Sequence, residues 1–204
     1  MNKFPLISLA AAALLALASF DAPAAQWSGA TLRQGAPVTL ETLQQTHWIA
    51  DGRDDAPRKV YVFLDANCIY CAQFWADARP WVDSGKVQLR YLMVGVIAPT
   101  SAGKAATLLA DPDPAGRLTA YERAHAFGVA RMLQGGPHVS MEDANLPPTP
   151  VSPDVARFLE TNQGFMNALN LRGTPGLVFR GLDGQTVAIG GIPRAGLESV
   201  FGAR

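Results

Sequence analysis

Hydrophobic residues occur along the chain in short runs that predict strands alternating with helices. Residues 58–65 form a run of β-branched and aromatic residues without polar alternation, which is typical of a strand covered on both faces. Residues 87–97 form a second apolar run and predict a second strand. Residues 176–180 and 185–189 predict two further strands, because the turn residues Asp183-Gly184 between them indicate a hairpin.

Helical patterns fill the segments between these strands. A helix is expected after residue 68, and Pro80 should kink or end it. Residues 134–151 are rich in Gly and Pro and predict an irregular excursion. Further helices are predicted at 40–45, 102–110, 115–127, 152–170 and 194–201, the 152–170 helix opened by Ser152 and Pro153. The order of elements predicts an α/β fold with a helical insertion at about 100–165.

The first 25 residues have the pattern of a secretory signal peptide. Lys3 gives a positive start, an apolar run extends from Leu6 to Ala18, and small residues at 22–25 suit cleavage. A membrane anchor is the alternative, although the run is short for a bilayer span. We therefore expect a signal peptide at 1–25, an N-terminal extension at 26–50 and a catalytic domain at 51–204. No later stretch predicts a transmembrane helix.

Composition narrows the classes of function. Among 204 residues, Lys+Arg and Asp+Glu both number 17, so no charge surplus points to nucleic acid or to an anionic membrane surface. With 49% hydrophobic residues, the chain is too apolar for a disordered protein. Two cysteines are too few for a disulfide scaffold. Export places this single pair of thiols where disulfides persist.

The pair, Cys68-Ile69-Tyr70-Cys71, stands where a buried strand passes into a helix. Residues three apart share a helix face, so the two sulfurs can reach each other. If Cys68 begins the helix, unpaired backbone N–H groups and the helix dipole favour its thiolate. We therefore expect Cys68 to be an exposed nucleophile, Cys71 a buried resolving thiol and Tyr70 an exposed residue of the motif.

Two structural roles compete with redox chemistry. A permanent bridge across so short a loop removes little chain entropy, so it stabilises poorly. A metal site would need His47, His125 or His138, none of which has ligand spacing to another or to the cysteines. We therefore expect neither a metal nor another cofactor. Asp65, just before the motif, is a candidate proton-transfer group or helix cap.

A second motif, Thr174-Pro175, lies between the helix at 152–170 and the strand at 176–180. By itself it indicates an ordinary trans turn, since few X–Pro bonds are cis. Together with the upstream Cys-x-x-Cys it favours a cis-proline.

Several segments resemble the DsbG/DsbC family of thiol:disulfide interchange proteins. They are His47-Trp48-Ile49 with Asp51-Gly52, Val60–Phe63, the Cys68–Cys71 motif, Gln73-Phe74-Trp75, residues 78–90, residues 94–97 and Thr174-Pro175. The resemblance implies a thioredoxin fold, Cys68 as nucleophile, Cys71 as its partner, and Thr174 with cis-Pro175 tuning the thiolate and touching substrate. It also implies a periplasmic protein kept reduced by a DsbD-type membrane reductase.

Two features depart from the family pattern. Ile69 stands where the family usually carries Pro, and the residues between the cysteines help to set the reduction potential. Only about 20 residues separate the expected cleavage site from His47, so we expect no N-terminal dimerisation domain and a monomer.

The leading hypothesis is an exported thiol–disulfide oxidoreductase that reduces or isomerises disulfides in exported clients and reduces sulfenylated cysteines. The alternatives are a DsbA-like net oxidant and a non-catalytic chaperone or binding protein with a thioredoxin fold.

Overall fold

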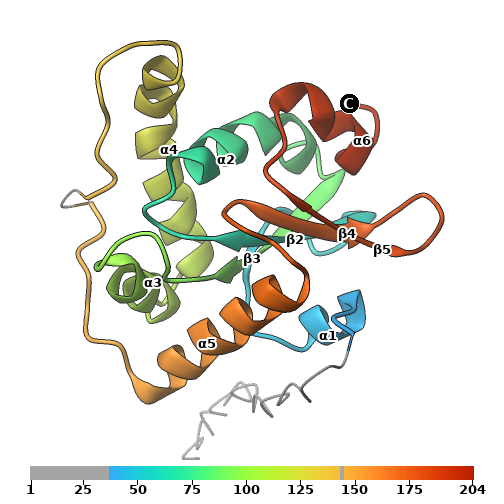
Figure 1. Ribbon diagram of the computed structural model, residues 1–204. Coiled ribbons are helices and arrows are strands. Elements are labelled where there is room, and N and C mark those ends of the chain that lie inside the picture. Colours follow the sequence, from blue (N-terminus) through green and yellow to red (C-terminus); the bar gives the residue numbers. More distant parts are fainter. Residues whose placement is uncertain (1–36, 143–144) are drawn as a thin grey trace, which may run out of the picture.

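The computed structural model describes residues 37–142 and 145–204, in which helices cover both faces of a five-stranded sheet (Figure 1). The strands are β1 (Ile49–Asp51), β2 (Arg58–Leu64), β3 (Val87–Met93), β4 (Gly176–Arg180) and β5 (Thr186–Gly190). Their order is β1-β3-β2-β4-β5, with β2 and β3 parallel and the other neighbours antiparallel. The predicted signal peptide at 1–25 lies outside the described residues.

Three helices between β3 and β4 form the predicted insertion. The helices are α1 (Leu40–Gln44), α2 (Ile69–Val82), α3 (Ser101–Leu109), α4 (Pro114–Met132), α5 (Pro153–Ala168) and α6 (Leu197–Phe201), the last preceded by a 3₁₀ turn at Arg194–Gly196. The Ser152 hydroxyl accepts a hydrogen bond from the Val155 N–H at 3.3 Å, and Pro153 is the first helical residue. The start predicted for α5 is therefore confirmed.

The strand β2 is buried on both of its faces, as its unbroken apolar sequence predicted. Val60, Val62 and Leu64 belong to the core cluster that includes the apolar sides of α2 and α4. Tyr61 and Phe63 point the other way, into a second cluster with residues of α1 and α5. This alternation holds the C-terminal end of β2, and the loop that follows it, between two helical layers.

The sheet differs from the predicted one at two places. The strand β3 ends at Met93 instead of continuing to residue 97, because the N–H groups of Val96 and Ile97 donate to the Asp65 carboxylate at 2.7 and 3.0 Å. The edge strand β1 was not predicted, since three residues are too few for a periodic pattern. It pairs with β3, so the boundary placed after residue 50 falls inside a strand.

Pro80 was expected to kink or end the helix α2, but α2 continues through Pro80 to Val82, so Pro80 does not end it. Tertiary contacts hold the last turn in place. The Trp81 side chain is fully buried, packs edge-on against Phe201 and donates from Nε1 to the Gly202 carbonyl at 2.8 Å. These contacts compensate for the backbone hydrogen bond that a proline cannot make. Within the described part of the chain, no helix has the length and apolar character needed to cross a membrane.

Candidate active site

The two cysteines lie at the N-terminus of α2, where the sequence placed them. Cys68 is the N-cap residue, and its Sγ accepts a hydrogen bond from the Cys71 N–H at 3.2 Å. Both side chains are free thiols. A sulfur at this position meets the unpaired N–H groups and the positive end of the helix dipole, both of which stabilise a thiolate.

The loop at Thr174 and Pro175 lies against the Cys68 sulfur. The bond between these two residues is cis, which confirms the expectation for Pro175. The Cys68 thiol donates to the Thr174 carbonyl oxygen, with 3.2 Å between sulfur and oxygen. The Thr174 hydroxyl oxygen is buried and has no hydrogen-bond partner among the described residues.

These contacts move the pKa values of the two thiols in opposite directions. The pKa of Cys68 is lowered, first by its hydrogen bond with the Cys71 thiol and then by the Thr174 side chain and the Cys71 N–H, against burial and the Asp65 charge. Burial raises the pKa of Cys71 well above its ordinary value, and the neighbouring Cys68 adds to this effect. Cys68 is thus the more acidic thiol of the pair, and Cys71 the less acidic one.

The expectation that Cys68 is exposed is wrong for the side chain as a whole. Cys68 is 3% exposed and Cys71 fully buried. The Thr174 carbonyl covers the Cys68 sulfur, a contact between residues far apart in sequence that local patterns do not reveal. Tyr70 is 58% exposed, as predicted, whereas Ile69 is half-buried against the core.

Asp65 organises the loops around the cysteines and does not cap α2. Its carboxylate is fully buried and accepts four hydrogen bonds. The donors are the N–H groups of Asn67, Val96 and Ile97 and the hydroxyl of Ser101. Asp65 therefore ties the loop before Cys68 to the start of α3, while its charge opposes the Cys68 thiolate.

Replacing Asp65 with asparagine should make Cys68 more acidic and the protein less stable. Removing the charge lowers the pKa of Cys68 further, so alkylation by iodoacetamide should reach half its maximal rate at a lower pH than in the wild type. An amide cannot accept all four hydrogen bonds, and an unsatisfied buried donor costs about 1–3 kcal/mol in the free energy of unfolding. Asp183→Asn, on the exposed hairpin turn, is the control and should change neither measurement.

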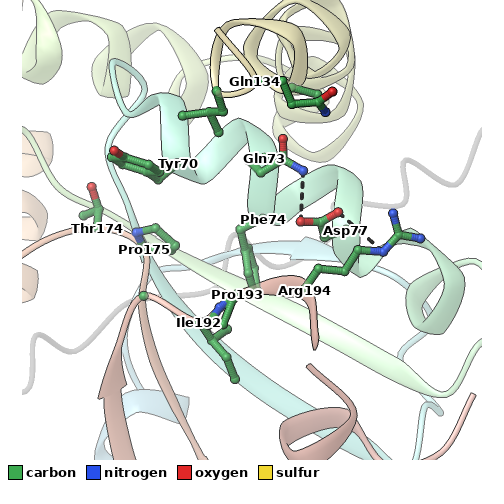
Figure 2. Close-up of a pocket in the computed structure, with 13 residues that line it drawn as sticks. Tyr70, Gln73, Phe74, Asp77, Gln134, Thr174, Pro175, Ile192, Pro193 and Arg194 are labelled. Atoms are coloured by element: carbon green, nitrogen blue, oxygen red, sulfur yellow. Dashed lines mark hydrogen bonds and ion pairs between the residues drawn. The ribbon is translucent and has the colours of Figure 1, made fainter. Parts of the chain in front are cut away.

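A hollow of about 600 Å³ is lined by Tyr70, which lies between the two cysteines in sequence, and by Thr174, whose carbonyl contacts Cys68 (Figure 2). Tyr70 and Phe74 of α2 and Pro175 of the cis loop line the end nearest the site. At its far end the Gln73 amide donates to Asp77 at 2.9 Å, and the Arg194 guanidinium lies 3.9 Å from the same carboxylate. The hollow therefore offers apolar walls and one polar end, beside the Thr174–Pro175 loop.

Two of the three histidines considered as metal ligands are engaged elsewhere in the fold. His47 stacks on Phe158, and His125 hydrogen-bonds the Tyr121 carbonyl at 2.8 Å. Across residues 37–142 and 145–204, no three His, Cys, Asp or Glu side chains gather in a way that could hold a metal ion.

Sequence reasoning missed Glu122, a fully buried carboxyl of α4. A signal was present, because Glu122 shares the buried face of its helix with Leu118, His125 and Val129, at helical spacing. A carboxylate among such positions is unusual in a soluble helix and indicates either a buried partner or a function.

A sheet of this order, with a Cys-x-x-Cys motif at the start of α2 and a cis-proline loop against it, is the arrangement of a thioredoxin fold. Two DsbG thiol:disulfide interchange proteins are similar in sequence. The Pseudomonas aeruginosa protein is 38% identical over 173 residues, 83% of this chain and 62% of that protein. The Escherichia coli protein is 40% identical over 153 residues, 75% of this chain and 56% of that protein. Over most of its length, the chain is thus similar in sequence to DsbG thiol:disulfide interchange proteins.

Solved structures support the same fold. The catalytic domain of Proteus mirabilis ScsC has a TM-score of 0.54 at 18% identity and covers 76% of this chain and 86% of that domain. A periplasmic thioredoxin-like protein from Salmonella enterica has a TM-score of 0.55 at 17% identity, over 76% of this chain and 87% of that protein. No protein-family model matches the chain. The chain spans about three-fifths of the length of the DsbG relatives.

Proposed function

We propose that this protein reduces or isomerises disulfides in exported proteins and reduces their sulfenylated cysteines. The observation that carries the proposal is the hydrogen bond from the Cys71 N–H to Cys68 Sγ at the helix N-terminus, 3.2 Å long. It stabilises a thiolate on one cysteine while the other remains a thiol. A nucleophile and a resolving thiol are the two groups that disulfide exchange requires.

The reaction follows from this division of roles. The Cys68 thiolate attacks one sulfur of a client disulfide, and the other client sulfur leaves as a thiolate. Cys71 then loses its proton and attacks Cys68 Sγ, which releases the second client sulfur and forms the Cys68–Cys71 disulfide. Two electrons have then passed to the client. With a sulfenylated client, Cys68 attacks the S–OH sulfur and the oxygen leaves as water after taking up a proton.

The hollow beside the site supports a peptide as substrate. Tyr70 presents an exposed aromatic ring at its mouth, and Thr174 and Pro175 form the wall nearest Cys68. Because the Thr174 carbonyl covers the sulfur, a client cysteine has to approach along this wall. An extended client segment would place apolar side chains in the hollow and its cysteine at the Thr174–Pro175 edge.

The cellular setting is part of the proposal. The relatives are DsbG proteins, and one structure of the same fold is a periplasmic protein. We place this protein in the periplasm, with a DsbD-type membrane reductase returning the Cys68–Cys71 disulfide to the dithiol. Its clients are exported proteins with disulfides or sulfenylated cysteines.

The direction of electron flow is tested by equilibrating the purified protein with glutathione buffers and quantifying the free thiols of Cys68 and Cys71. We expect a reduction potential at or below about −180 mV, in the range of an isomerase or reductant. A potential near about −120 mV would instead indicate a net oxidant, because the dithiol would then be too stable to pass electrons to clients. The Cys68→Ala variant, which cannot form the disulfide, is the control.

A further inference from the structure

A recess lined by cations lies at the end of β2 opposite to the cysteine pair. It has a volume of about 330 Å³ and is bounded by α1, the start of β2 and the end of β4. The helix α1 contacts β4 at this place (Figure 1). The charged side chains that line the recess, among the described residues, are those of Arg58, Lys59, Arg90, Arg180 and Glu41. This basic recess shares no lining residue with the hollow beside Tyr70, so it is a separate site.

Cations outnumber anions in the basic recess, although the whole chain is neutral. Lys+Arg and Asp+Glu both number 17 in the sequence. In the recess, four cationic side chains stand against the single carboxylate of Glu41, which pairs with Arg180 at 2.9 Å. The Asp54 carboxylate accepts from the Gln88 amide at 2.6 Å and does not line the recess. The described lining therefore carries an excess of three positive charges.

Two of the cations face each other on neighbouring strands. The antiparallel register of β2 and β4, continued one residue beyond the Val60–Phe179 pair, sets Lys59 opposite Arg180. Like charges directly opposite each other in a sheet are destabilising. Among the described residues, the Lys59 ammonium hydrogen-bonds only backbone carbonyls, at 2.5 and 2.6 Å. An anion bound between the two strands would remove the repulsion between them.

Arg90 supplies a guanidinium whose orientation is fixed by its neighbours. It lies 4.4 Å from the centre of the Trp48 ring and 5.4 Å from that of the Tyr61 ring. Its Nη1 donates to the Tyr61 hydroxyl at 2.7 Å, and its Nε to the Gln88 side chain at 3.0 Å. Within the described part of the chain, Nη2 has no acceptor. A guanidinium held in this way loses little conformational freedom when a ligand binds.

Arg58 and Arg180 also keep donors that no protein group uses. Arg58 Nη2 donates to the Arg180 carbonyl at 3.2 Å, which brings the two residues together at the end of the sheet. Arg180 donates from Nη1 to the Gly184 carbonyl at 2.8 Å and from Nη2 to Glu41 at 2.9 Å. Arg180 Nε and Arg58 Nη1 have no acceptor among residues 37–142 and 145–204, and neither has the buried Nε of Arg58.

We propose that the basic recess binds a small soluble dianion of the phosphate class, held by the guanidinium groups of Arg58, Arg90 and Arg180. Guanidinium groups are the donors that phosphate oxygens prefer, because each presents parallel N–H bonds at matching spacing. A doubly charged anion offsets most of the threefold excess of positive charge. The inference goes beyond disulfide exchange and does not depend on it, since Cys68 follows the far end of β2.

The geometry of the recess favours phosphate over a carboxylate. The three guanidinium groups come from the start of β2, from β3 and from the end of β4, so they reach the recess from different strands. A tetrahedral anion presents acceptor oxygens in several directions, whereas the two oxygens of one carboxylate lie in a plane. The volume of the recess also accommodates the organic part of a small phosphate monoester.

The experiment is calorimetric titration of the purified protein with inorganic phosphate and, separately, with glycerol 1-phosphate, at pH 7.5. Sodium chloride keeps the ionic strength constant, because screening alone would otherwise change surface charge interactions. The two probes distinguish free phosphate from a phosphate monoester as the preferred ligand. We expect saturable binding of at least one of them to wild type, with one site per chain and with affinity above that for succinate, a dicarboxylate of the same charge.

Variants connect this binding with the recess. Arg180→Gln and Arg58→Gln should each weaken binding at least about fivefold, because a charge-assisted donor is lost. Glu41→Gln should tighten it about twofold or more, because the carboxylate that competes with the ligand is removed. Arg157→Gln is the matched control, since Arg157 is an exposed arginine of α5 that pairs with Asp154, and should bind as wild type does.

Three results would overturn the proposal. They are the absence of saturable binding of both phosphate probes to wild type, equal affinity in wild type and both arginine variants, and tighter binding of succinate than of either phosphate probe. None of them bears on disulfide exchange, and insulin reduction by Arg180→Gln should remain at the wild-type rate. Because Arg180 is exposed, this variant should fold, and the temperature of unfolding without ligand checks that it does.

Discussion

Replacing Cys68 with alanine is expected to reduce the rates of insulin reduction and of sulfenylated-peptide reduction to the uncatalysed background, a loss of about 10³-fold or more. The reason is structural, because Cys68 is the one sulfur that accepts the Cys71 N–H and carries the lowered pKa. The Cys71 thiol cannot take over, since it is fully buried and its pKa is raised. Turbidity of precipitating insulin and chromatography of the peptide measure the two rates.

The same variant separates catalysis from a chaperone function. The Cys68→Ala protein should keep its fold, because the Cys71 N–H still donates to the Cys68 carbonyl at 3.0 Å and the Asp65 hydrogen bonds do not involve the Cys68 side chain. Suppression of aggregation of an unfolded client should therefore be the same as for wild type. Full retention of both reductase activities by Cys68→Ala would contradict the proposed function and favour a non-catalytic binding protein.

Replacing Cys71 with alanine is expected to trap clients as mixed disulfides on Cys68. The first attack still occurs because the helix N-terminus and Thr174 remain in place, although loss of the Cys71 thiol removes the largest cause of the lowered Cys68 pKa. The adduct then persists because no second thiol lies within reach to resolve it. Non-reducing electrophoresis and mass spectrometry should show client adducts that dithiothreitol removes, at least tenfold more abundant than with wild type.

The double variant Cys68→Ala/Cys71→Ala is the control for trapping and should form no adduct. Adducts of equal abundance on wild type and Cys71→Ala would mean that Cys71 does not resolve the intermediate. The clients recovered from Cys71→Ala would also identify which exported proteins the hollow beside the site accepts.

Local sequence was sufficient for most of the fold. In the run at 58–65, the residues that face each side of the sheet are apolar. The run therefore predicted a central strand without knowledge of the neighbouring strands. The start of α5 was readable because Ser152 and Pro153 act within one turn of the chain. The predictions failed where contacts between residues distant in sequence determine the local structure. At Pro80, for example, the helix continues, and the hydrogen bond from Trp81 to Gly202 stabilises its last turn.

In the candidate site too, local motifs were predictable and contacts between distant segments were not. Cys68 and Cys71 were found from sequence because a strand, a Cys-x-x-Cys motif and a helix are consecutive. The burial of the Cys68 side chain was not predicted, because the Thr174 carbonyl that contacts its sulfur lies 106 residues further along the chain. The four donors that surround Asp65 also come partly from segments more than 30 residues away. Such contacts depend on how the helices pack against the sheet, so a local sequence pattern does not reveal them.

By itself, therefore, the sequence determined the strand, the helix and the pair of thiols at their junction, because short-range backbone preferences and hydrophobic periodicity act within a few residues. The tertiary structure decided how those thiols differ. The Thr174–Pro175 loop and α4 pack against α2 and bury both sulfurs. In this environment the pKa of Cys68 is lowered and that of Cys71 is raised. The same packing buries Glu122. Burial and charge act through space, so only the assembled fold fixes these effects.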